Sequence, residues 1–227
     1  MDLSKLTVAV FDVFAYILPG LVLLMALSLF EATFLKSGLI PLDRVAKASA
    51  LALIASYFLG QLAHAFAGWL LIHVLPELPN DRKGGFRKDM FNHTRQRVIE
   101  VFNIDVTPFT PAKLQTLEVY QLADSYIATK EKVSERDSLI AREGFAKTSL
   151  GAFLLSALSV LSTVMRGGLH WRLATGSGSL SVAATLIVGL LLLLIAAVFW
   201  RRYVFFHGLK VTSTYALFLA LTTKTVT

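Results

Sequence analysis

The polar residues that are best suited to take part in chemistry lie inside an apolar stretch of the chain, residues 48–75. Tyr57, Gln61 and His64 span about two helical turns there, and Gln61 and His64, three positions apart, share one face of a helix. A histidine within a membrane span serves as a hydrogen-bonding group or a proton carrier. We therefore predict an intramembrane polar site, used either for hydrogen bonds between helices or as the lining of a pore.

Patterns typical of catalytic and metal sites are absent from the sequence. There is no cysteine, which excludes disulfides, thiolate metal sites and thiol nucleophiles. His64 and His73 are nine positions apart and so cannot form a metal pair on one helix. The sequence also lacks the HExxH, EF-hand, P-loop and GxSxG patterns. We expect no catalytic site, no metal site, no cofactor and no enzymatic activity.

A carboxylate and a Pro-Gly pair mark the start of the first apolar run. Asp12 is predicted to lie at the cytoplasmic edge of the membrane, where it either caps the helix N-terminus or forms an ion pair. The candidate partners on that side are Arg142, Arg201 and Arg202. Pro19 and Gly20, about two turns further along, predict a helix kink because proline removes an intrahelical hydrogen bond. The kink is either a fixed bend or a hinge.

Basic residues cluster where the chain leaves the second apolar stretch, namely Arg82, Lys83, Arg87 and Lys88. Next to a membrane such a cluster is predicted to contact anionic lipid headgroups or phosphate. The chain carries a net charge of +7, but acidic and basic residues nearly balance within 76–147. Direct nucleic-acid binding is therefore not expected.

The elements that must position these residues are membrane-spanning helices. The chain is 55% hydrophobic and only 16% charged, which is too apolar for an ordinary soluble domain of its length. Four uncharged or nearly uncharged runs are long enough to cross about 30 Å of hydrocarbon as helices. They are residues 13–30, 48–75, 148–165 and 180–200.

The orientation follows from the lysines and arginines, most of which fall before the first run, between the second and third, or after the fourth. Cytoplasmic segments are enriched in these residues. Both termini and the long connection are therefore predicted to be cytoplasmic, which makes the chain an all-α multi-pass membrane protein. Trp171, Trp200 and Tyr203 are expected at the membrane interfaces.

The long connection is predicted to form a small helical cytoplasmic domain between spans 2 and 3. Residues 86–102 have apolar side chains near one helical stripe, a second helix is expected from Pro111 to about Ile127, and a third is expected to start at Ser134 and continue into the membrane. The chain is therefore predicted to divide into four regions. They are the first transmembrane helix pair (1–75), the cytoplasmic helical region (76–147), the second transmembrane pair with cytoplasmic extensions (148–206) and a cytoplasmic or interfacial tail (207–227).

Two features favour contacts with other copies of the chain. Small residues recur every four positions around His64, and such a surface lets another helix approach closely. They are Ser56, Gly60 and Gly68. The apolar segment 211–221 is too short to span the membrane and is predicted to be an interfacial helix or an oligomer contact. A homo-oligomer is expected on both grounds.

The stretches "FDVFAYILPGLVLL", "GQLAHAFAGW", "RDSLIAREGFAKTSLGAFLLS" and "FWRRYVFFHGLKVTSTYALF" give the chain a layout that resembles small bacterial four-span membrane proteins of anti-phage defence loci, with an architecture similar to the Kiwa membrane subunit. The resemblance is one of layout, together with Asp12, Pro19, Gly20 and the three arginines named above. It implies an inner-membrane protein that acts with a cytoplasmic partner encoded in the same locus.

Two functions are consistent with these features. The first is a non-enzymatic oligomeric membrane sensor or effector of anti-phage defence, in contact with lipids, other copies and a cytoplasmic partner. The second is a regulated ion channel or small-solute carrier unrelated to defence, in which Tyr57, Gln61 and His64 line the path.

Overall fold

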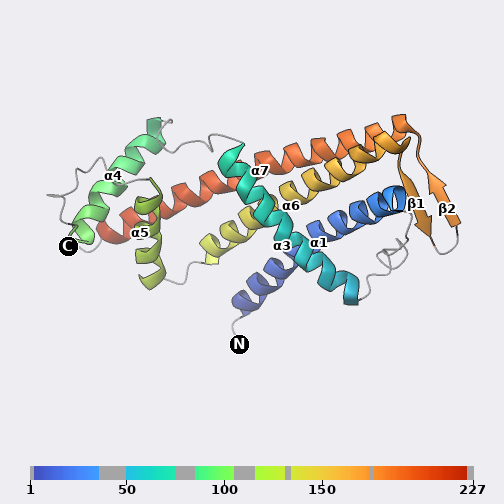
Figure 1. The fold of residues 1–227 in the computed structure, drawn as a ribbon. Coiled ribbons are helices and arrows are strands. Elements are labelled where there is room, and N and C mark those ends of the chain that lie inside the picture. The colour runs from blue at the N-terminus through green and yellow to red at the C-terminus, as the bar shows by residue number, and fades with distance from the viewer. Residues whose placement is uncertain are drawn as a thin grey trace. The chain divides into compact units, whose positions relative to one another are not determined.

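The structure is a computed structural model that describes residues 3–35, 50–74, 85–104, 116–130, 134–173 and 176–223. The side chains of 3–12 and of a few other residues at the ends of these ranges lie outside that description. The helices are α1 (Leu3–Phe34), α3 (Ala50–His73), α4 (Gly85–Val101), α5 (Thr116–Lys130), α6 (Ser134–Ser162), the short 3-10 helix η2 (Thr163–Arg166) and α7 (Val182–Thr223) (Figure 1). Two strands, β1 (His170–Leu173) and β2 (Gly176–Ser179), pair antiparallel.

The four predicted spans all fall within helices. By length and composition, four helical segments could cross a membrane, and they are Val13–Phe34, Ala50–His73, Ser138–Arg166 and Val182–Thr223. The predicted helix from Ser134 into the third span is confirmed as α6, and the predicted extension of the fourth span is confirmed as the continuous helix α7. These features make the chain a multi-pass membrane protein.

The β-hairpin is the element that the sequence prediction of an all-α fold missed. It occupies the connection between the third and fourth spans, where Trp171 pairs with Gly178. Gly167 and Gly168 precede it with φ values of 87° and 122°, a backbone conformation that glycine adopts without steric cost. A Cβ at Gly168 would also fall 2.2 Å from the Leu180 carbonyl oxygen. The two glycines therefore let the chain turn back after η2.

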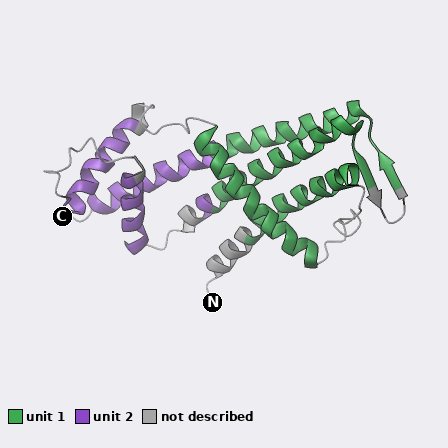
Figure 2. Cartoon of the chain, viewed as in Figure 1, with its two compact units in different colours: residues 1–76, 141–203 green, residues 77–140, 204–227 purple. Residues whose placement is uncertain are grey.

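Two compact units divide the chain (Figure 2). Unit 1 comprises residues 1–76 and 141–203, and unit 2 comprises 77–140 and 204–227. Both α6 and α7 therefore contribute residues to each unit. The predicted regions, which follow the spans along the chain, stay a prediction; in the structure the described residues after 203 are grouped with those of the connection between spans 2 and 3.

Within unit 1, α1 and α3 approach each other through small residues. A Cβ added to Gly20 would fall 1.7 Å from the Ser56 carbonyl oxygen, and one added to Gly60 would fall 2.2 Å from the Tyr16 carbonyl oxygen. One turn beyond Gly20, Leu24 packs with Ala52. The partners run in opposite directions along the two helices, so the contact is antiparallel. Gly20, predicted as part of a kink with Pro19, thus has a packing role.

The same buried stripe of α3 also meets α6. A Cβ at Gly151 would fall 2.0 Å from the Ala63 carbonyl oxygen, and Ala63 and Ala152 form one buried cluster with Leu23 of α1. In Figure 1, α3 lies across α1 and α6. The predicted close-packing surface of α3 is therefore real, but it is occupied by helices of the same chain. These small residues no longer argue for a homo-oligomer.

Unit 2 has its own apolar core, formed by one face each of α4, α5 and the end of α7. Its buried members are Phe91, Val98, Val119, Ala123, Ile127, Val211, Tyr215 and Phe218. Their spacing of three, four or seven residues within each helix places them on one face. The prediction of helices near 86–102 and up to Ile127 is confirmed, with α5 continuing to Lys130.

The C-terminal apolar segment corrects a prediction. Residues 211–221 are the last turns of α7, and Val211, Tyr215 and Phe218 are almost fully buried in the unit 2 core. The segment is therefore not a separate interfacial helix, while an oligomer contact through its exposed residues stays a prediction. The physical reason is that α4 and α5 each have too little apolar surface to be stable alone, and the end of α7 completes their core.

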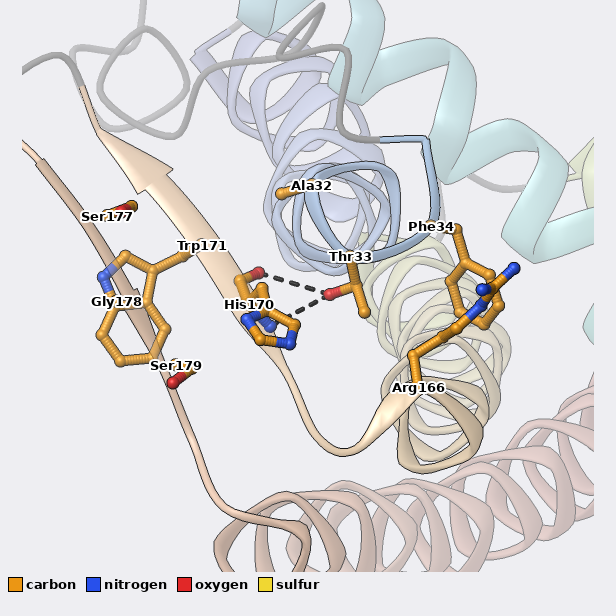
Figure 3. A pocket seen from close by; sticks show the side chains of 9 residues that line it. All are labelled: Ala32, Thr33, Phe34, Arg166, His170, Trp171, Ser177, Gly178 and Ser179. Carbon is orange, nitrogen blue, oxygen red and sulfur yellow. Dashed lines mark hydrogen bonds between the residues drawn. The ribbon is translucent and has the colours of Figure 1, made fainter.

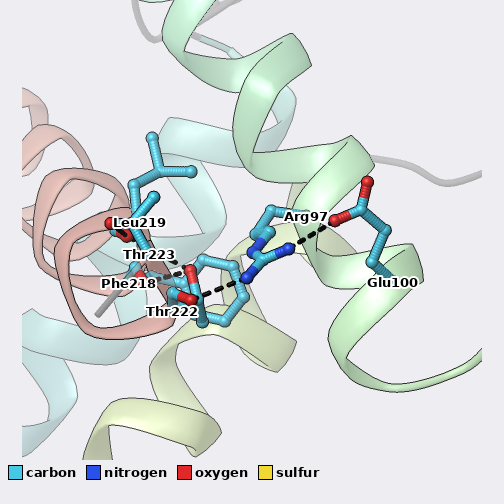
Figure 4. Close-up of polar contacts among 6 residues, drawn as sticks. All are labelled: Arg97, Glu100, Phe218, Leu219, Thr222 and Thr223. Carbon is cyan, nitrogen blue, oxygen red and sulfur yellow. Dashed lines mark hydrogen bonds and ion pairs between the residues drawn. The ribbon is translucent and has the colours of Figure 1, made fainter. Parts of the chain in front are cut away.

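Arg97 of α4 holds the last turn of α7 in place (Figure 4). Its Nη2 donates to the carbonyl oxygen of Thr222 at 2.6 Å, and its Nη1 lies 2.6 Å from Oε2 of Glu100. The last carbonyls of a helix have no intrahelical partner and carry partial negative charge, so a guanidinium there is favourable. Arg97 thus fixes both the position and the end of α7 within unit 2.

The first testable consequence concerns the glycines of unit 1. Gly60→Ala should lower the free energy of unfolding by about 1–3 kcal/mol, because the added methyl group forces α1 and α3 apart. Gly144→Ala is the matched control, since a Cβ there meets nothing within 4 Å, and it should be neutral or stabilise by up to about 1 kcal/mol through helix propensity. Heating the detergent-purified variants and following the folded fraction by size-exclusion chromatography measures both. Equal melting of the two variants would contradict the packing described here.

Candidate functional site

The predicted intramembrane site centres on a hydrogen bond between two spans. His64 of α3 places Nδ1 2.9 Å from Oγ1 of Thr148 on α6. The Thr148 hydroxyl also donates its proton to the Gly144 carbonyl at 2.9 Å. Since a hydroxyl has one proton, His64 Nδ1 carries the hydrogen and donates to Thr148. This tautomer leaves the lone pair on Nε2, the nitrogen that can accept a proton.

Aromatic rings of two helices surround the imidazole. The ring of Tyr16 on α1 lies edge-on to His64, with 5.7 Å between centroids, and edge-on to Tyr57, with 5.8 Å between centroids. Tyr57 and His64 are therefore joined through Tyr16, which the sequence did not single out. Gln61 is half-buried and makes no hydrogen bond among the described residues. The structure thus brings together two of the three predicted residues and adds Tyr16 and Thr148.

Two charged residues of α6 lie near this pair. Lys147 packs against the bare backbone of Gly68, where a Cβ would come within 3.0 Å of Nζ. Lys147 directly precedes Thr148, the hydrogen-bond partner of His64, and Glu143 lies one turn earlier on α6. A glutamate and a lysine four residues apart are a common pattern on exposed helix faces, so their spacing did not indicate that Lys147 meets Gly68 of α3. The contact follows from how α3 crosses α6.

The chemistry available here is hydrogen bonding and proton exchange. The imidazole, the Thr148 hydroxyl and the two charged side chains together provide donors and acceptors at the edge of an apolar bundle. Among the described residues no group of three or more His, Cys, Asp and Glu could hold a metal ion. The geometry is that of a polar clamp between α3 and α6, and its free imidazole nitrogen is the feature that could also take part in transport.

The structure describes the predicted arginine partners of Asp12 but not the Asp12 side chain. Asp12 lies inside α1, which begins at Leu3, so it is not the N-cap of that helix and the capping interpretation is wrong. Its side chain lies outside the described residues. Arg142 on α6 and Arg201 and Arg202 on α7 are exposed. An ion pair between Asp12 and one of these arginines stays a prediction, as does the kink at Pro19, which lies within α1.

The predicted lipid or phosphate cluster falls largely outside the described part of the chain. This is true of Arg82 and Lys83 and of the Arg87 side chain, while Lys88 is exposed on α4. The contact of these residues with anionic headgroups stays a prediction.

A second site, which the sequence did not indicate, is a pocket of about 580 Å³ beside the hairpin (Figure 3). It is lined by the end of α1, by Arg166 of η2 and by both strands; the lining residues are Ala32, Thr33, Phe34, Arg166, His170, Trp171, Ser177, Gly178 and Ser179. The guanidinium of Arg166 lies over the Phe34 ring, 5.3 Å from its centroid. The Trp171 indole lies across Gly178, where any Cβ would collide with it.

Two threonines fix the base of the hairpin to the helices. The backbone N–H of His170 donates to Thr33 Oγ1 of α1, and that of Leu169 donates to Thr185 Oγ1 of α7, both at 3.0 Å. Each threonine donates its own proton to the carbonyl four residues earlier, Leu29 of α1 for Thr33 and Ser181, just before α7, for Thr185. Both hydroxyls are buried and satisfied in this way. The glycines Gly167 and Gly168 and the Gly-Ser run 176–179 are the sequence signals of a turn in this connection.

Comparison with known proteins gives no relative to guide the assignment. No protein-family model, no curated protein sequence and no solved structure matches this chain. The function must therefore be argued from the residues of the two sites and from the architecture.

The clamp between His64 and Thr148 can be tested by a double-mutant cycle. Thr148→Val should cost about 1–3 kcal/mol of stability, because it leaves the half-buried imidazole N–H of His64 without an acceptor. His64→Leu together with Thr148→Val should cost clearly less than the sum of the single changes. Thr212→Val is the control, because Thr212 bonds only the Gly208 carbonyl, also four residues back in its helix. Unfolding in denaturing detergent gives each value, and strict additivity would exclude the clamp.

Proposed function

We propose that this chain is a non-enzymatic, oligomeric inner-membrane sensor or effector of a bacterial anti-phage defence system and that it acts with a cytoplasmic partner protein. The observation that carries the proposal is the pairing of four candidate spans with a second compact unit of α4, α5 and the end of α7. This layout is the one on which the resemblance to four-span defence proteins depends. In the proposal, unit 2 receives the partner and unit 1 anchors it.

The oligomeric part of the proposal has support in the apolar side chains that the spans leave exposed. α3 exposes Ile54, Phe58 and Leu62, and α7 exposes Leu190 and Leu194. A membrane protein presents such surfaces to lipid or to a second copy. The glycine faces of α1, α3 and α6 are already occupied and play no part in it.

The orientation in the proposal places both termini and unit 2 in the cytoplasm and the hairpin on the opposite side. The absence of cysteine allows a direct test with single substitutions at exposed serines, Ser177 of the hairpin and Ser213 of unit 2. A membrane-impermeant maleimide should label Ser177→Cys in intact spheroplasts and Ser213→Cys only after permeabilisation. The reverse pattern, or labelling of both in intact spheroplasts, would overturn the orientation.

A regulated ion channel or small-solute carrier is the second candidate. The observation that favours it is the imidazole of His64, which is hydrogen-bonded to Thr148 between two candidate spans, because ionisable groups inside a span often mark ion or proton paths. In that case Tyr57, Gln61 and His64 would line the path, and flux would need neither phage nor partner.

The two candidate functions predict different changes in the membrane potential of cells that express the chain. Cells expressing the chain with its neighbouring gene should survive phage challenge, with the potential unchanged before infection. If the chain is an effector, leakage appears only on challenge and His64→Ala alters it. If it is a sensor, protection occurs with an intact potential. Steady ion flux from the chain alone, with no protection against phage, would exclude the defence role and establish the channel.

A further inference from the structure

We propose that the hairpin pocket of unit 1 binds a phosphate group, carried by a lipid headgroup or present as a free phosphate compound. A role for this binding in sensing rests on the function proposed above, but the binding itself does not. The pocket is separate from the His64 clamp and from the basic residues that the sequence indicated for phosphate, because its lining comes from the end of α1, η2 and the two strands.

The lining of the pocket is rich in hydrogen-bond donors and carries positive charge. Arg166 contributes a guanidinium, which matches phosphate oxygens with two parallel N–H groups. The imidazole of His170 and the hydroxyls of Ser177 and Ser179 add further donors, and both serines are exposed. None of the nine lining residues is acidic. Glu31, the acidic residue nearest in sequence on α1, is buried and is not part of the lining.

The backbone at the base of the hairpin is held in place before any ligand arrives, and Figure 3 shows the Arg166 guanidinium on the Phe34 side of the lining and the two serines on β2. The hairpin is fixed at Leu169 and His170 by the two threonine hydroxyls, and the Leu180 N–H closes it further by donating to the Leu169 carbonyl at 2.8 Å. Arg166 rests on the Phe34 ring, a contact that restricts a flexible side chain without using its hydrogen-bond donors. A site of this kind needs little reorganisation to bind an anion.

The surroundings of the pocket are those of a membrane interface. Met165, next to Arg166, has 87% of its surface exposed, which is expected for an apolar side chain in contact with lipid. Trp171 is half-buried across Gly178, and tryptophan is enriched at the level of the headgroups. A phosphate on a lipid headgroup would therefore lie at the depth of Arg166, while a free phosphate compound would reach the same donors from water.

The test uses the full-length protein in maltoside micelles, which contain no phosphate. The chain has three tryptophans, so Trp69→Phe with Trp200→Phe leaves Trp171 as the only fluorescent indole. The probes are inorganic phosphate, dioctanoyl phosphatidylglycerol and dioctanoylglycerol, which has the same acyl chains without phosphate. Native mass spectrometry of the unmodified protein measures retention of the lipid independently of fluorescence.

The variants separate phosphate binding from a general loss of charge or fold. Arg166→Gln should raise the dissociation constant at least ten-fold, because it removes the only guanidinium among the lining residues that the structure describes. Arg142→Gln removes an exposed arginine of α6 away from the pocket and should leave binding unchanged. Phe34→Leu removes the ring below Arg166 but none of the donors, so it should weaken binding less than Arg166→Gln. Helicity by circular dichroism confirms that each variant is folded.

Each result has a distinct meaning. A saturable response to both phosphate probes that Arg166→Gln weakens establishes a phosphate site open to free compounds, and a response to the lipid alone with the same sensitivity identifies the headgroup as the source. An equal response to dioctanoylglycerol, equal binding by Arg166→Gln and the unmodified protein, or no saturable binding by either method overturns the proposal. Because no phage is involved, a failure of the defence role leaves these results unaffected.

Discussion

The structure of unit 1 depends on one constraint, the close approach of helix backbones where α3 crosses α1 and α6. A Cβ added at Gly20, Gly60 or Gly151 would fall 1.7 Å, 2.2 Å or 2.0 Å, respectively, from a carbonyl oxygen of the facing helix. In a membrane there is no hydrophobic gain from bringing apolar helices together, so packing at short distance and hydrogen bonds must supply the stability. The three glycines provide the first, and they determine which residues of α3 and α6 can meet.

Three threonines of unit 1 use their hydroxyl groups in the same way. Thr148, Thr33 and Thr185 each donate their proton to the carbonyl four residues earlier in the chain and accept a hydrogen bond from another element. Thr148 takes the histidine N–H of α3, and the other two take consecutive backbone N–H groups at the start of the hairpin. A threonine in an apolar helix can do this without an unsatisfied group, so it joins elements where a charged residue would be costly.

Unit 2 shows how a short apolar segment can be misjudged. Residues 211–221 are as apolar as part of a membrane span, yet Val211, Tyr215 and Phe218 complete a helical core with α4 and α5. The cap of Arg97 on the Thr222 carbonyl gives α7 a defined end within that core. In the proposed function this matters because the unit offered to a cytoplasmic partner is built from two separate stretches of chain, one of which continues from the last candidate span.

The sequence by itself determined the four candidate spans, the helices α4 to α7 and the presence of polar residues within α3, because long uncharged runs and apolar periodicity are local properties of a chain. It could not determine which polar residues meet. Tyr16 and Thr148 reach His64, and Lys147 reaches Gly68, only because of where α3 crosses its neighbours. The same holds for the hairpin pocket, whose lining comes from residues more than one hundred positions apart, and for Gly20, whose role appears only when Ser56 faces it. Such contacts depend on the register between helices, which composition and periodicity do not encode.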